Sequence, residues 1–135
     1  MVATPPVRVF WWWNSEAELH DGLYGYRAFL DASPGSTGKD GSGRAYDDAI
    51  SKRMEVDACM EGIADLKRWC LLDGYFRQGR CDEGRGWIPL ARAVNLEVKP
   101  KHMSGSRAKF DVEICRAVRA LWKVHLDRRA MVGVG

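Results

Sequence analysis

The residues best suited to binding chemistry lie between positions 99 and 109. Cationic side chains alternate there with hydroxyl and imidazole groups, and the set comprises Lys99, Lys101, His102, Ser104, Ser106, Arg107 and Lys109. Lysine and arginine neutralise phosphates and release the counterions that surround a duplex. Arg107 can also pair with a guanine edge, and serine or histidine with other base edges. This segment predicts contact with double-stranded DNA.

The charge along the chain supports a polyanion as partner. Residues 1–76 carry 8 Lys and Arg against 12 Asp and Glu, whereas residues 77–135 carry 13 against 6. The two parts therefore have net charges of −4 and +7, which sum to the formal +3 of the chain. A basic C-terminal part is typical of a surface that binds a polyanion. The alternative is a basic surface that only faces solvent.

A helix–turn–helix is the arrangement that would position these basic residues. Apolar residues predict a short helix over 87–94, in which Pro89 fits only the first turn. Asn95 can take the left-handed conformation that ends a helix, and Leu96 would fill the turn. Pro100 then suits the first turn of a second helix. Gly105 is expected to loosen that second helix.

The remaining elements are predicted to be helical as well, so we expect a mainly α protein. Ser15 and Glu18 have the spacing of a capping box, Asp47 or Asp48 can cap a helix, and Asp65 can cap the next one. Spacings of three and four predict apolar helix faces, which we expect to pack in the core. The predicted face residues are Leu19, Leu23, Tyr26, Leu30, Ile50, Met54, Val56, Cys59, Met60, Ile63, Leu66, Trp69, Cys70, Phe110, Val112, Ile114, Cys115, Val118, Leu121 and Trp122.

A Gly-rich stretch over 31–44 predicts a flexible linker. It divides the chain into a Trp-rich N-terminal arm with its linker, residues 1–44, and a helical DNA-binding domain, residues 45–135. Val7–Trp13 can form either a short strand or the start of a helix. Its Trp11, Trp12 and Trp13 cannot all point one way, so the arm either contacts a partner or folds back onto the core.

No catalytic or metal-binding arrangement is apparent in the sequence. The three histidines, at positions 20, 102 and 125, are far apart and lack a nearby nucleophile motif, and no G-K-[ST] phosphate cradle occurs. The four cysteines include no C-x-x-C pair, so a zinc site would need distant ligands. We expect Cys59, Cys70 and Cys115 to be buried thiols and Cys81 to be exposed. We therefore expect no enzyme, metal or cofactor.

The order of these features resembles the fourth region of bacterial sigma factors. It runs from an acidic-capped helix to a helix ending G-Y-F-R-Q-G, then to L-A-R-A-V-N-L and a basic helix. Within that group the chain is similar to the sigma-like phage late-gene antitermination (Q) proteins, over roughly residues 45–122. The inserted Gly-rich loop at 80–86 departs from the family layout and leaves the helix register open.

The resemblance implies a sequence-specific transcription regulator in the cytoplasm of a host bacterium. Such proteins bind duplex DNA near a late promoter, load onto paused RNA polymerase and make it read through terminators; nascent RNA is a further candidate partner. The DNA contact would then fall on the basic helix of residues 99–109. The polymerase contact would fall on Trp11, Trp12, Trp13, Tyr75, Arg77 and Arg80.

A second hypothesis is a small phage or mobile-element inhibitor that binds a host enzyme through its aromatic arm. The Trp-rich segment and the acidic N-terminal part favour it. In either case no membrane partner is expected, because the purely apolar stretches are only a few residues long. The first residues, Met1–Pro6, also lack the basic start and apolar core of a secretory signal.

Overall fold

The computed structural model describes residues 12–27 and 44–133. Its elements follow in the order α1 (Glu16–Leu23), α2 (Arg44–Glu61), α3 (Leu66–Leu72), a π-helical turn η2 (Asp73–Arg77), α4 (Trp87–Ala93), a 3₁₀ turn η3 (Pro100–His102) and α5 (Met103–Gly133). No strand occurs in the described residues, and the predicted mainly α class is confirmed. None of the helices in these two ranges is both long and apolar enough to cross a membrane.

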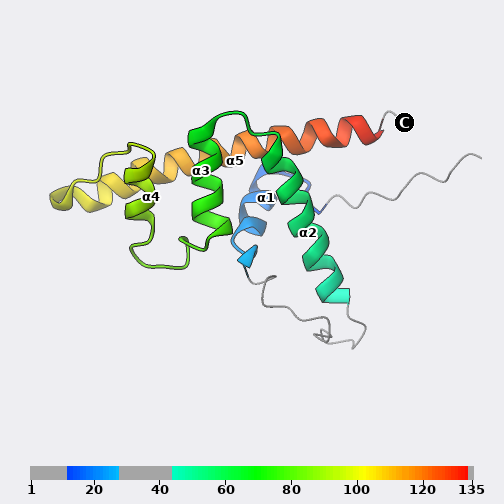
Figure 1. The fold of residues 1–135 in the computed structure, drawn as a ribbon, viewed down its shortest axis with the longest axis horizontal. Coiled ribbons are helices and arrows are strands. Elements are labelled where there is room, and N and C mark those ends of the chain that lie inside the picture. Colours follow the sequence, from blue (N-terminus) through cyan, green and yellow to red (C-terminus); the bar gives the residue numbers. More distant parts are fainter. Residues whose placement is uncertain (1–11, 28–43, 134–135) are drawn as a thin grey trace, which may run out of the picture.

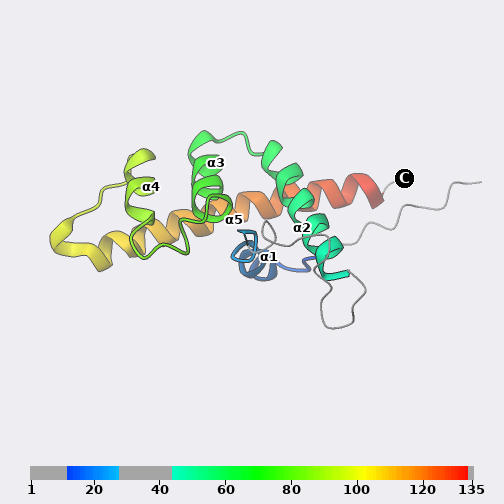
Figure 2. The same cartoon turned by 60° about the horizontal axis from the view of Figure 1, so that its bottom comes forward.

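The long helix α5 is the element against which the others pack (Figures 1 and 2). Its 31 residues extend for about 46 Å at 1.5 Å per residue. In both views α1 lies beside the C-terminal half of α5 and α2 meets that half at a steep angle, while α3 lies against the middle of α5 and α4 lies towards its N-terminal end. The predicted inner face is confirmed for Phe110, Ile114, Val118 and Leu121, each of which is buried.

Local capping signals locate two of the helix starts. The Ser15 hydroxyl accepts a hydrogen bond from the Glu18 backbone N–H at 3.1 Å, and this caps α1. Asp65 accepts the Arg68 backbone N–H at 2.9 Å and caps α3. The predicted cap at Asp47 or Asp48 is wrong, because α2 begins at Arg44 and both residues lie inside the helix.

Several predicted core residues face solvent instead. Met54, Leu66 and Val112 are 66%, 74% and 50% exposed. Each residue of a helix advances about 100° around its axis, so Leu66 lies about 140° away from the buried Leu71. Val112 is two residues from Phe110 and therefore falls on the opposite side of α5. The inner side of α3 and η2 consists of Leu71, Leu72, Tyr75 and Phe76.

The cysteine predictions hold only in part. Cys59 is buried as expected, whereas Cys115 is exposed and Cys70 and Cys81 are half-buried. All four thiols are free. Cys115 follows the buried Ile114 by one residue, and a step of about 100° is enough to turn its side chain out of the core.

The N-terminal segment packs into the same core as α5. Trp13, Leu19, Leu23 and Tyr26 are all buried there. Gly22 makes the packing of Trp13 possible, because a Cβ at this position would overlap the indole. Residues 13–26 therefore form part of the helical unit rather than a detached arm. The predicted strand or helix at Val7–Phe10, Trp11, and the linker at residues 31–43 lie outside the described residues.

Candidate nucleic-acid interface

The connection from α4 to α5 ends the first helix as the sequence predicted. Asn95 has a φ of 64°, which is left-handed. The Asn95 N–H donates to the Arg92 carbonyl at 3.0 Å, and the Leu96 N–H donates to the Ala91 carbonyl at 2.9 Å. This is the pair of bonds that defines a Schellman motif. Leu96 is half-buried and packs against the core, as expected for a residue that fills the turn.

The second helix begins with η3 and continues without a break into α5. Six residues, 94–99, separate α4 from η3, whereas a DNA-binding helix–turn–helix has a turn of three or four. The Lys99 N–H donates to the Ser106 hydroxyl at 2.9 Å, which ties the turn to α5. Ser106 is only 7% exposed. It therefore holds the connection in place and presents no hydroxyl to a ligand.

Arg107 also acts within the protein. Its Nη2 donates to the Tyr75 hydroxyl at 2.7 Å, and its Nε donates to Asp111 Oδ1 at 2.9 Å. The guanidinium lies over the rings of Tyr75, Trp87 and Phe110, 5.3–5.6 Å from their centroids. Cation–π contacts of this kind join α4 and η2 to α5. Arg107 is thus engaged in packing and not directed at a base edge.

The other predicted DNA-binding residues are exposed at the end of the molecule formed by the turn and the start of α5. We call this surface the basic end, and it consists of Lys99, Lys101, His102, Ser104 and Lys109 together with Arg85. Arg85 lies across a pocket of about 460 Å³ from Ser104, and the buried Trp87 lines that pocket. Residues 85–109 contain six Lys and Arg and one acidic residue, Glu97, a net charge of +5. Such a surface attracts a polyanion.

The residues predicted to contact a protein partner do not form one exposed surface. Trp11 lies outside the described residues, Trp12 is half-buried with Lys52 over its ring, and Trp13 is 5% exposed. Tyr75 is buried under Arg107. Arg77 and Arg80 are half-buried and already have partners within the protein. Arg77 pairs with Asp57 and Asp73, and Arg80 donates to the Gly86 carbonyl.

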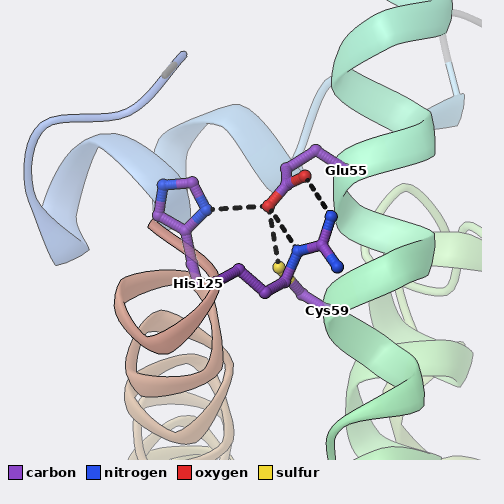
Figure 3. Close-up of polar contacts among 4 residues, drawn as sticks. Glu55, Cys59 and His125 are labelled. Carbon is purple, nitrogen blue, oxygen red and sulfur yellow. Dashed lines mark hydrogen bonds and ion pairs between the residues drawn. The ribbon is translucent and has the colours of Figure 1, made fainter. Parts of the chain in front are cut away.

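The structure also brings together a polar cluster that was not expected from the sequence (Figure 3). We call it the Glu55 cluster, and it consists of Glu55, Cys59, His125 and Arg128. Glu55 Oε1 lies 3.1 Å from His125 Nδ1 and accepts Cys59 Sγ–H at 3.4 Å. Arg128 donates to both carboxylate oxygens at 2.9 Å. The cluster joins α2 to α5, and the rings of Trp13 and His125 make a T-shaped contact with their centroids 5.7 Å apart.

The electrostatics of the Glu55 cluster favour an ionised carboxylate and a neutral thiol. Burial alone would raise the pKa of Glu55, but hydrogen bonds from His125, Arg128 and Cys59 outweigh it and lower that pKa to about 2. Burial, followed by the charge of Glu55, raises the pKa of Cys59 to about 12. A buried, protonated thiol is a poor nucleophile.

The same residue types could in principle hold a metal ion. One ligand atom from each of Glu55, Cys59 and His125 lies within 4.8 Å of the others, and zinc binds all three types. However, Oε1 already receives three hydrogen bonds, and the Arg128 guanidinium occupies both oxygens. A divalent cation would have to displace that positive charge and ionise the thiol. The donor set therefore fits a buried ion pair better than a metal site.

A weak sequence signal for this cluster exists on α2 alone. Glu55 and Cys59 are four residues apart, which places them on one face of a helix. His125 and Arg128 lie more than 65 residues further along the chain. Only the packing of α5 against α2 brings the two pairs together.

Comparisons with family models, with curated proteins and with solved structures found no match. The interpretation of the interface therefore depends on its own geometry and charge.

Proposed function

We propose that this protein is a duplex-DNA-binding transcription regulator and that the basic end is its DNA-contacting surface. The observation that carries the proposal is the exposure of Lys99, Lys101, His102, Ser104 and Lys109 at one end of the molecule, where the first turns of a long helix project. Lysines there neutralise phosphates. His102 and Ser104, next to the helix start, are the candidates for base edges.

The packing inside the basic end supports the same proposal. Ser106 and Arg107 fix the turn and the start of α5, so the exposed cations are held on a rigid element. A preorganised surface loses less conformational freedom on binding. We retain the sigma-like antitermination role as the proposed biological activity. The order of elements in the sequence supports this antitermination role. The role makes RNA polymerase the proposed protein partner.

The test of DNA binding is a salt titration with a random-sequence duplex. Lys101→Gln combined with Lys109→Gln should flatten the slope of log K against log salt by about two, near one for each lost phosphate contact. The matched control is Lys52→Gln with Arg53→Gln, which removes two cations from α2. An unchanged slope in the first variant, with its helical content intact, would refute the basic end as the interface.

The antitermination role needs a separate assay. Purified bacterial RNA polymerase should read through an intrinsic terminator when the protein and a template with its binding site are present. The Lys101→Gln, Lys109→Gln variant should lose this effect, because loading would depend on DNA contact. If the protein binds DNA but causes no read-through, the antitermination role is refuted and the proposal of DNA binding stands.

A further inference from the structure

A second basic surface begins at the basic end, at Lys109, and runs along the outward side of α5 towards its C-terminus. Lys109, Arg116 and Lys123 follow one another at intervals of seven residues, and Arg119 lies between the last two. Seven residues make almost two full turns, so these side chains share one face, and all four are exposed. This face lies opposite the buried residues of α5.

Three of these cations also line a groove beside α3. The groove has a volume of about 540 Å³ and lies between α5 and the connection from α2 to α3. Arg68 faces Arg116, Arg119 and Lys123 across it, and the only carboxylate among the lining residues is Asp65. That carboxylate is already engaged as the cap of α3. The lining therefore carries four positive charges against one negative charge.

The partners of these cations within the protein leave them able to bind an anion. Arg116 pairs with Glu113 at 2.8 Å and Arg119 with Glu16 at 3.4 Å, and both arginine side chains are more than 60% exposed. Exposed ion pairs of this kind are weak and exchange readily with other partners. Among the side chains described in residues 12–27 and 48–131, no carboxylate forms an ion pair with Arg68 or Lys123.

The chemistry and the dimensions fit a phosphate backbone. The planar guanidinium matches the geometry of a phosphate group. Lys109 and Lys123 are 14 residues apart, or about 21 Å along the helix. A duplex presents one phosphate per strand for about every 3.4 Å of its axis, so this length faces several phosphates. No aromatic side chain lines the groove, so it lacks the stacking platform typical of single-strand binding.

We propose that this α5 groove, formed by Arg68, Arg116, Arg119 and Lys123, binds the phosphate backbone of the duplex held at the basic end. The inference rests on the proposed function, because it assigns the groove to the same DNA. Lys109 belongs to both surfaces and makes them continuous. The DNA contact then extends along α5 beyond its first two turns.

The test compares a 10-base-pair with a 30-base-pair duplex of random sequence. Arg119→Gln combined with Lys123→Gln, the groove variant, should lower the slope of log K against log salt by about two on the long duplex. On the short duplex its affinity and its slope should match those of the parent. The Lys101→Gln, Lys109→Gln variant should weaken binding to both lengths. The Lys52→Gln, Arg53→Gln protein serves as the control for the loss of two charges, and thermal melts confirm that each variant is folded.

Each outcome separates the two proposals. A groove variant that matches the parent on the long duplex would overturn the groove, while the basic end stands. Loss of long-duplex binding in the groove variant alone would support the groove and refute the basic end. A parent that binds neither duplex refutes both proposals. Tighter binding of single-stranded RNA than of duplex, lost in the groove variant, would overturn a duplex partner.

Discussion

The Glu55 cluster offers the sharpest test of how the fold is held together. Glu55→Gln keeps the size of the side chain but removes its charge, and it places an amide N–H₂ where one acceptor oxygen was. Arg128 and His125 would then face a neutral group with one acceptor fewer. His125 is fully buried, so its ring cannot turn to water for a replacement. We expect α2 and α5 to separate more easily.

The magnitude follows from the contacts that Glu55 makes. A hydrogen bond to a charged group contributes about 1.5–3 kcal/mol, and a surface ion pair about 0–1 kcal/mol. The Glu55 side chain is 14% exposed and that of Arg128 is 41% exposed. Solvent therefore weakens the Arg128 contacts, and their contribution lies near the lower of these two ranges. Because contributions within one cluster do not add fully, we expect a loss of about 3 kcal/mol. For a chain of this size that lowers Tm by about 12 °C.

The pH dependence of this loss identifies its cause. The pKa of Glu55 is about 2 in the folded protein, against an ordinary value of 4.5. A pKa that is lower in the folded state contributes stability that is present above the ordinary value and is lost as the pH falls towards the folded value. The difference in stability between parent and variant should therefore be constant above pH 5 and shrink between pH 5 and 2.

The assay is thermal and chemical denaturation followed by circular dichroism, at several pH values. Glu61→Gln is the matched control, because Glu61 is an exposed glutamate on the same helix. It should leave Tm nearly unchanged. A Glu55→Gln protein that melts within 2 °C of the parent, or a stability difference that does not vary with pH, would refute this account of the cluster.

Three further predictions concern packing, the turn and thiol reactivity. Trp13→Ala should cost about 3–5 kcal/mol, because the indole is buried, and Trp69→Ala should cost less than half of that, because Trp69 is half-buried; equal losses in denaturant titrations would contradict this. Asn95→Ala should cost about 1–2 kcal/mol in the same titration, because an alanine is strained at a left-handed φ; a neutral result would mean that the turn relaxes. Iodoacetamide should alkylate Cys115 first and Cys59 last in the native protein, as read by peptide mass mapping, because Cys59 is buried with a pKa near 12; early labelling of Cys59 would show that α2 and α5 open readily.

Features that depend on neighbouring residues in the chain could be predicted from the sequence. Ser15 and Asp65 cap their helices through bonds that reach only three residues. Asn95 ends α4 because it tolerates a left-handed φ. The inner face of α5 could also be predicted, because a strong apolar periodicity defines it over several turns.

Features that depend on packing between distant segments could not be predicted in this way. Met54 and Leu66 fit an apolar pattern, but the sides of α2 and α3 that become buried depend on where α5 lies. The packing of Arg107 against the protein could not be inferred either, since the aromatic rings under its guanidinium come from three different elements. The contact of Glu55 with His125 joins residues 70 positions apart, and no local rule reaches that distance.

The position of α5 in the chain has a consequence for how the protein is made. Among the described helices, α1 to α4 all leave the ribosome before α5, against which they pack. Trp13 packs against His125, and α3, which carries Leu71 and Leu72, packs against α5. These apolar side chains therefore stay uncovered until residues 103–133 emerge from the ribosome. Contacts that span so much of the chain slow folding and prolong the exposure of apolar surface. The nascent chain is therefore most vulnerable to aggregation and proteolysis just before α5 is complete.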